Sequence, residues 1–221
     1  MMTAVKTALA TIRTLADLLE RLGGVPLDRV RFHPFPGTAT EEDVTAIQDL
    51  EGRSCELVDG VLVEKPVGLR ESILAIALAS LLRAFVVPRN LGLISGEAGT
   101  MKLFEGLVRI PDVAYASWSR FPSGRIPTEP IPWLTPDLAV EVLSKSNTER
   151  EMARKRREYF ASGVCLVWLI DPEARTVRVY ASPDGFVTLD ESATLDGGDI
   201  LPGFELPLRN LFSELDRHSD A

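Results

Sequence analysis

The sequence has few of the residues on which the commonest nucleophilic and metal sites depend. It contains two histidines, His33 and His218, and two cysteines, Cys55 and Cys165, in a chain of 221 residues. A histidine-based catalytic triad, a zinc site and a disulfide framework are therefore poorly supported. Cys165 lies in the apolar run VCLVWLI, where we expect it to be a small core residue. An enzyme built from this sequence would depend on carboxylates and lysine for its chemistry.

The sequence also lacks long hydrophobic runs and an excess of positive charge. No stretch is long enough to span a membrane and the N-terminal residues show no signal-peptide core, so we expect a cytoplasmic protein without a membrane partner. The formal net charge is −8, so a polyanion would have to be bound by a local basic patch or through a metal ion. The hydrophobic content of 45% suits one globular domain with a sizeable core.

Apolar periodicity and turn signals predict a mixed α/β or α+β arrangement around a central sheet. Helices are expected at 14–24, 40–52, 69–87, 146–163 and 206–212. Strands are expected at 54–67 (a hairpin that turns at Asp59-Gly60), 91–95, 99–104, 107–117, 137–144, 164–172, 176–182, 185–190 and 192–196. The almost uniformly apolar helix at 69–87 should be buried on most sides. The proline-rich connection at 118–136 is long for a compact domain and is expected to be a functional loop.

Three charged side chains occupy positions that the apolar pattern predicts to be buried. Asp112 shares one face of an apolar strand with Ile110, and Glu141 lies in the middle of the apolar strand PDLAVEVL. Lys155 lies on the same helical stripe as Tyr159, and this stripe should pack inward. A buried charge is costly unless it is paired, hydrogen-bonded or bound to a metal ion, so these three residues need partners.

Two interpretations account for these buried charges. Two carboxylates from neighbouring strands offer the hard oxygen ligands that suit Mg²⁺ or Mn²⁺. A lysine beside them can orient a water, help deprotonate it, or stabilise charge on a phosphate, which together predict metal-assisted phosphodiester hydrolysis. In the structural interpretation, Asp112 caps a turn after Pro111, and Glu141 forms a buried salt bridge with Lys155.

Four motifs follow one another along the larger, C-terminal part of the chain. They are CELVDGVLVE, RIPDVAYAS, PDLAVEVLSKSN and ARKRREYFASGVCLVWLIDPEARTVRVY. Together they resemble the bacterial Uma-type family of restriction-endonuclease domains, in the PD-(D/E)XK nuclease superfamily. The resemblance covers roughly residues 51–213 and implies a restriction-endonuclease-like fold, with a mixed central β-sheet flanked by helices. Residues 1–50 are then expected to form a helical extension, and residues 214–221 a polar tail.

The resemblance also implies roles for individual residues. Asp112 and Glu141 match the two acidic metal ligands, which would bind Mg²⁺ or Mn²⁺. The superfamily has a lysine two residues after the second acid, where this chain has Leu143. In the Uma-type family the lysine role moves to the following helix, to a lysine four residues before a tyrosine. Lys155 and Tyr159 match that pattern, so Lys155 is the expected catalytic lysine.

Other positions are weaker candidates. Glu56 matches a recurrent family glutamate and is expected as an outer metal or water ligand, the alternative being an exposed acid of the hairpin. Lys145 lies just past the strand and is expected to be solvated. Arg70 or Glu71 stands where the family often has a histidine.

The resemblance implies an endonuclease that hydrolyses phosphodiester bonds in nucleic acid, with DNA as the expected substrate. Arg150 and the run Arg154 to Arg157 form a dense basic cluster that either touches phosphates or is a solvated helix face. Two other functions stay open. One is a non-catalytic module that binds nucleic acid or protein on a nuclease-like fold. The other is a homodimeric interaction protein that uses the 118–136 loop, and a homodimer is also compatible with nuclease activity.

Overall fold

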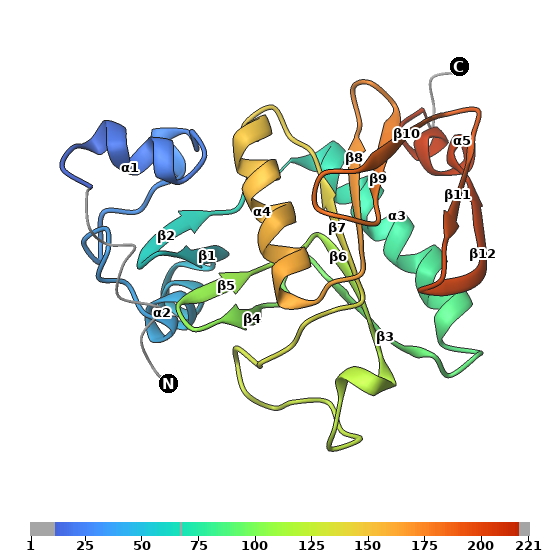
Figure 1. The fold of residues 1–221 in the computed structure, drawn as a ribbon, viewed down its shortest axis with the longest axis horizontal. Helices are drawn as coiled ribbons and strands as arrows, with labels where there is room; N and C mark the ends of the chain where they lie inside the picture. Colours follow the sequence, from blue (N-terminus) through green and yellow to red (C-terminus); the bar gives the residue numbers. More distant parts are fainter. Residues whose placement is uncertain (1–11, 67, 217–221) are drawn as a thin grey trace.

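The chain builds two main β-sheets that meet beside helix α4 (Figure 1). The computed structural model describes residues 12–66 and 68–216. The four-stranded sheet has the order β2-β1-β5-β4, from β1 (Cys55–Val58), β2 (Val61–Glu64), β4 (Met101–Phe104) and β5 (Leu107–Arg109). The six-stranded sheet has the order β10-β9-β8-β7-β6-β3, from β3 (Gly92–Gly96), β6 (Val113–Ser117), β7 (Leu138–Val142), β8 (Leu166–Asp171), β9 (Thr176–Tyr180) and β10 (Phe186–Asp190). A two-stranded ribbon is formed by β11 (Thr194–Gly197) and β12 (Leu201–Pro207).

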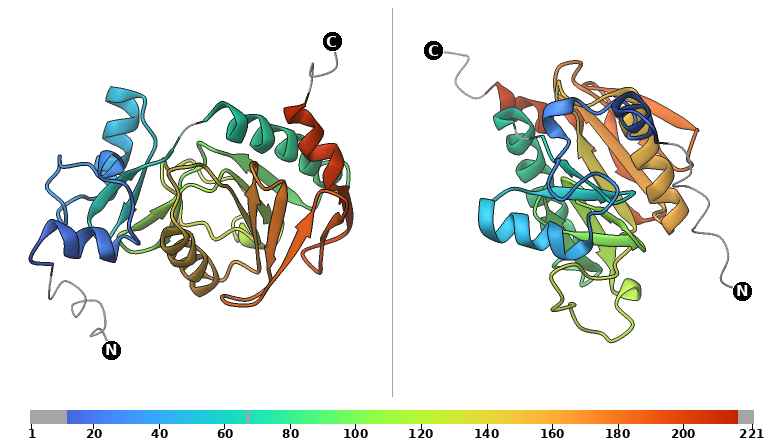
Figure 2. Two further views of the ribbon diagram at one scale, coloured as in Figure 1. Left: turned by 90° about the horizontal axis from the view of Figure 1, so that it is seen from above. Right: turned by 90° about the vertical axis from the view of Figure 1, so that its left-hand side faces the viewer.

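Helices cover both faces of the six-stranded sheet (Figure 2). The α-helices are α1 (Leu15–Arg21), α2 (Glu41–Glu51), α3 (Leu69–Val86), α4 (Glu149–Ser162) and α5 (Leu208–Phe212). In the described residues, 3₁₀ turns lie at Leu27–Arg29, Trp118–Arg120 and Ser213–Leu215. One core lies between α3, α5 and the sheet and includes Leu78 and Trp168, while the other lies under α4 and includes Tyr159. In the described part of the chain, no helix is both long and apolar enough to cross a membrane.

The hairpin predicted at Asp59-Gly60 is confirmed. Both residues have positive φ angles, 53° and 72°, as a two-residue turn of type I′ requires. Val58 pairs with Val61 across the turn. This register places Glu56 on β1 and Lys65 just beyond the end of β2.

The segment 107–117, predicted as one strand, is instead divided between the two sheets. β5 pairs with β1 and β4, whereas β6 pairs with β3 and β7. Pro111 lies between the two strands, and its missing N–H prevents a continuous ladder. The chain therefore crosses from one sheet to the other immediately before Asp112.

The strand–helix–strand unit predicted around 137–172 is confirmed. β7 and β8 pair in parallel, and α4 is the connection that parallel strands need. The helix ends at Gly163, whose φ is 102°, as expected. Its N-cap is Thr148, two residues after the expected start at 146, because the Thr148 side chain accepts the N–H of Glu151 in a capping box.

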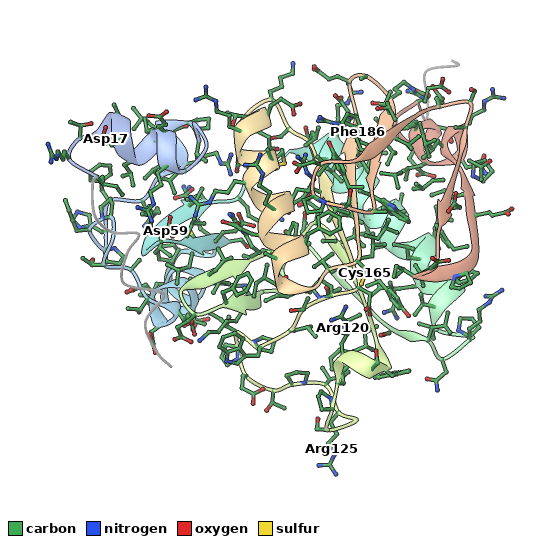
Figure 3. The ribbon with its side chains drawn as sticks, in the orientation of Figure 1. Asp17, Asp59, Arg120, Arg125, Cys165 and Phe186 are labelled. Atoms are coloured by element: carbon green, nitrogen blue, oxygen red, sulfur yellow. The ribbon has the colours of Figure 1, made fainter. Side chains whose placement is uncertain are left out.

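Two burial predictions are wrong. Helix α3 packs on the sheet through Leu78, but Leu69 and Ile76 are 79% and 69% exposed, because no further layer of the described chain covers its outer face. Cys165 is exposed because it precedes β8, where the chain enters the sheet. Its sulfur faces the Arg120 guanidinium at 3.7 Å, and Figure 3 shows it to the right of the lower end of α4.

The N-terminal segment is tied to the N-terminal end of α4. Arg29 is 6% exposed and makes a two-pronged ion pair with the buried Glu151, at 2.7 and 3.0 Å. Gly23 lies so close to α4 that a Cβ atom there would come within 2.7 Å of the Glu151 nitrogen. Whether 1–50 is a separate extension stays a prediction, and residues 1–11 and 217–221 lie outside the described residues.

We predict that Arg29→Ala lowers the free energy of unfolding by about 3–5 kcal/mol, because it leaves a buried carboxylate without its cation. Urea unfolding followed by tryptophan fluorescence measures this change. The control is Glu173→Ala, which removes an ion pair to Lys145 whose side chains are 68% and 86% exposed. This control should change the free energy by less than about 0.5 kcal/mol. Equal midpoints for the two variants would show that Arg29 does not anchor the segment.

Candidate active site

Asp112 and Glu141 lie at the same end of the six-stranded sheet. β6 and β7 are antiparallel, with Val113 opposite Val140, so the start of β6 meets the end of β7. The backbone N–H of Asp112 donates to the Val140 carbonyl oxygen at 3.0 Å. Its carboxylate Oδ2 accepts the Val142 N–H at 2.7 Å. The backbone therefore fixes Asp112 beside the strand that carries Glu141.

Lys155 lies between the Glu141 carboxylate and a third carboxylate, that of Glu56. Its Nζ lies 3.1 Å from Glu141 Oε2 and 3.0 Å from Glu56 Oε1. Tyr159, one helical turn further on, donates its hydroxyl to Glu141 Oε1 at 2.5 Å. The side chains of Glu56, Glu141, Lys155 and Tyr159 are all buried. The inward orientation that the helical stripe predicted for Lys155 is confirmed.

The three residues expected to be catalytic share one cleft of about 280 Å³. Its wall includes Asp112, Glu141 and Lys155. The structure therefore brings together side chains that lie far apart in the sequence, while their catalytic roles stay a prediction. The 118–136 loop does not line this cleft, since it connects the opposite ends of β6 and β7. Figure 3 shows Arg125 at its outer tip, pointing away from the rest of the molecule.

Glu56 is fully buried, so its alternative as an exposed hairpin acid is wrong. Its Oε2 pairs with Arg109 at 2.7 Å, and its Oε1 accepts the Ile110 N–H at 3.1 Å. Burial alone would raise the pKa of Glu56, but the Lys155 and Arg109 charges outweigh burial and lower the pKa to about 2. Glu56 is therefore ionised over the whole range in which the protein would work.

The pKa of Glu141 moves in the opposite direction. Burial raises it, the Lys155 charge offsets this only in part, and the nearby Asp112 carboxylate raises it further. Glu141 therefore keeps an unmet preference for another cation or a proton. Burial and the Glu141 charge also raise the pKa of Tyr159 well above 10, so its hydroxyl remains a hydrogen-bond donor.

Lys155 stays positively charged in this environment. Burial alone would lower its pKa, but Glu141 and Glu56 outweigh burial and raise the pKa above the ordinary lysine value of 10.5. A lysine that holds its proton so firmly is a poor general base at neutral pH. What Lys155 can supply is fixed positive charge and a firm position for the Glu141 carboxylate.

A second lysine, Lys65, lies at the site and was missed in the sequence. Its Nζ is 2.7 Å from Asp112 Oδ1 and also donates to the Ile110 carbonyl oxygen. Its side chain is only 6% exposed. A lysine before a proline at the end of a hairpin has no periodic signal, and its partner is 47 positions away.

The donor set suits a hard divalent cation. The cleft wall carries four carboxylates, from Glu71, Glu97, Asp112 and Glu141, against two lysine ammonium groups. Mg²⁺ commonly binds through one or two carboxylates together with waters and substrate phosphates, and Asp112 and Glu141 can provide that pair. Among residues 12–66 and 68–216, no group of three or more His, Cys, Asp or Glu side chains has the arrangement of a metal site. Glu56 does not line the cleft, and both its oxygens are already paired.

Several side chains of the basic cluster on α4 are engaged in contacts with the rest of the protein. Arg154 pairs with Glu158 and Asp59, and Arg156 stacks on the Tyr180 ring. Arg150 and Arg157 are exposed. Lys145, as expected, is solvated, with a side chain that is 86% exposed.

Comparisons with known proteins agree with this architecture. A family model described as "Uma2: Putative restriction endonuclease" matches residues 41–209, which begins at α2 rather than at residue 51. A crystal structure from Anabaena variabilis, described as a "putative nuclease belonging to DUF820", is 24% identical with a TM-score of 0.66. The similarity covers 73% of this chain and 91% of that one. Comparison with curated proteins gives no match. The predicted restriction-endonuclease-like fold is confirmed.

We predict different effects on stability for substitution of the two glutamates that share Lys155. Glu56→Gln should lower the free energy of unfolding at pH 7 by about 3 kcal/mol, because Lys155 and Arg109 lose a charge that the fold favours. Glu141→Gln should change it by less than about 1 kcal/mol or increase it, because folding raises the pKa of Glu141 and so disfavours its charge. Chemical denaturation of both variants measures the difference.

The pH dependence provides the control. Folding lowers the pKa of Glu56 from 4.5 to about 2, so its stabilising contribution is present above pH 4.5 and is lost as the pH falls towards 2. The raised pKa of Glu141 has the opposite sign, and its ionisation costs stability as the pH rises through 4.5. The gap between wild type and Glu56→Gln should therefore narrow in acid. A gap that widens there would contradict this assignment.

Proposed function

This chain belongs to the Uma2 family, and from that premise we propose that it is a metal-dependent endonuclease that hydrolyses phosphodiester bonds in nucleic acid, with DNA as the expected substrate. The observation that carries the proposal is the convergence of Asp112, Glu141 and Lys155 in one cleft. An acidic cleft in a chain of net charge −8 would repel a phosphate backbone. A bound cation resolves this conflict, which supports metal dependence.

Asp112 and Glu141 would hold the ion, Mg²⁺ or Mn²⁺. Such an ion would polarise a phosphoryl oxygen and lower the pKa of a bound water. The Val142 N–H fixes the Asp112 carboxylate, and the Tyr159 hydroxyl fixes that of Glu141, so both ligands are oriented in advance. The raised pKa of Glu141 supports this role, because a carboxylate short of positive charge gains most from a cation.

Lys155 would hold Glu141 in place and add positive charge where the transition state gathers negative charge. Its raised pKa supports an electrostatic role rather than proton abstraction. Glu56 would act one step further from the ion, by keeping Lys155 charged and oriented. Arg109 in turn keeps Glu56 ionised.

One observation favours the alternative of a non-catalytic binding module. Glu141 and Lys155 form a buried ion pair at 3.1 Å, as the residues of a purely structural pair would. The two proposals differ in metal binding, since a structural pair has no need of an added cation. A homodimer stays a prediction under either function.

We predict that the purified protein cleaves DNA in the presence of Mg²⁺ or Mn²⁺ and that EDTA abolishes cleavage. We expect the rate to fall at least about 100-fold in each of three variants, Asp112→Asn, Glu141→Gln and Lys155→Met. The first two lose a negatively charged metal ligand, and the third loses a positive charge that stabilises the transition state. Gel assays with plasmid and oligonucleotide substrates, and with RNA in parallel, measure this.

Lys145→Met is the matched control for charge, because Lys145 also lies near the cleft but is exposed and pairs with the exposed Glu173. It should retain the rate of wild type. If wild type cleaves no faster than Asp112→Asn, the nuclease proposal fails and the binding module is favoured.

A further inference from the structure

Lys65 lies in the cleft without a role in the mechanism proposed so far. It follows β2, in the segment that leads to α3. Its ammonium contacts two acceptors from one short stretch, the Asp112 carboxylate at 2.7 Å and the Ile110 carbonyl oxygen. Its side chain is 6% exposed, so Lys65 is nearly as buried as Lys155, Glu56 and Glu141. Such a placement is costly for a lysine unless its charge is used.

The two lysines of the cleft divide the two proposed metal ligands between them. Lys155 pairs with Glu141 and is also held by Glu56, so two carboxylates fix it inside the protein. Lys65 pairs with Asp112, and within residues 12–66 and 68–216 no second carboxylate forms an ion pair with its ammonium group. If the Asp112 partner were taken by another cation, Lys65 would be the lysine released, while Lys155 would remain bound to Glu56.

A divalent ion and the Lys65 ammonium compete for the same carboxylate. Asp112 Oδ2 is already engaged by the Val142 N–H, and Oδ1 is the oxygen that contacts Lys65. An ion bound to Oδ1 would share this oxygen with the ammonium, and two positive charges held by one oxygen repel each other. Metal binding at Asp112 and the present position of Lys65 are therefore unfavourable together.

We propose that Lys65 is a built-in counter-cation of Asp112, which a divalent ion displaces, and that the released ammonium becomes a phosphate-binding group of the cleft. This inference rests on the proposed nuclease function and deepens it. Lys65 keeps Asp112 neutralised before the ion arrives and places a compact positive charge in a cleft that otherwise presents carboxylates to a polyanion. A phosphate oxygen is the acceptor that the released ammonium would meet in a bound substrate.

The first test measures Mn²⁺ binding by titration calorimetry on the full chain after EDTA dialysis. Lys65→Met should bind Mn²⁺ at least about tenfold more tightly than wild type, because a positive charge next to the ion is removed. Lys145→Met is the control with the same change of charge near the cleft, and it should bind within about twofold of wild type, since Lys145 is exposed and screened. An affinity for Lys65→Met equal to or weaker than that of wild type overturns the inference.

The second test measures cleavage at saturating Mn²⁺. Lys65→Met should raise the KM for DNA at least about tenfold despite its tighter metal binding, because a phosphate ligand is lost. Tighter Mn²⁺ binding with unchanged KM and kcat would overturn the phosphate-binding role. Lys65→Gln, which keeps a donor for the Ile110 carbonyl, carries the same expectations if Lys65→Met does not fold.

The two tests separate this inference from the function on which it rests. If wild type cleaves DNA but the Lys65 variants bind Mn²⁺ no more tightly, the inference fails and the nuclease proposal stands. If the variants bind Mn²⁺ more tightly but no form of the protein cleaves nucleic acid, the competition is supported and the nuclease proposal fails. If neither wild type nor the variants bind Mn²⁺, both fail.

Discussion

The ammonium group of Lys155 is the contact on which the centre of this structure depends. It lies between Glu56 on β1 and Glu141 on β7, so one charge from α4 joins the four-stranded sheet to the six-stranded sheet. Without it, two buried carboxylates would face each other across the junction with no shared cation, an arrangement that costs several kcal/mol. The contacts of Lys155 with Glu56 and Glu141 therefore fix both the packing of the two sheets and the position of the cleft.

The two carboxylates are not equivalent, and the difference gives the site its chemistry. Arg109 adds a second positive charge to Glu56, whereas Asp112 adds a second negative charge to Glu141. The protein thus completes the charge balance around Glu56 and leaves that around Glu141 incomplete. A buried group held in an unfavourable state is expected where function requires it, since stability and activity often trade against each other. The incomplete side is the one that faces the cleft.

Sequence reasoning identified the features that depend on local pattern. The turn at Asp59-Gly60 follows from two adjacent residues, and the inward position of Lys155 follows from one stripe of a helix. It did not identify the crossing between sheets at Pro111, because alternation of apolar residues continues through that proline. It also missed Lys65 and Arg29, whose partners lie 47 and 122 positions away. Such contacts follow from how elements pack, and neither residue type nor periodicity marks them.

The basic residues of α4 show why charge alone was a weak guide to a nucleic-acid surface. Arg154 bonds to Asp59 in the hairpin turn, and Arg29 from the N-terminal segment holds Glu151 at the start of the same helix. These ties hold α4 against the hairpin and the N-terminal segment, and Glu151 lies on the same buried face as Lys155, four residues before it. Because a small rotation of α4 would move Lys155 away from Glu141, the N-terminal segment contributes to the geometry of a cleft that it does not line. The family match begins at residue 41, so this support comes in part from residues outside the matched region.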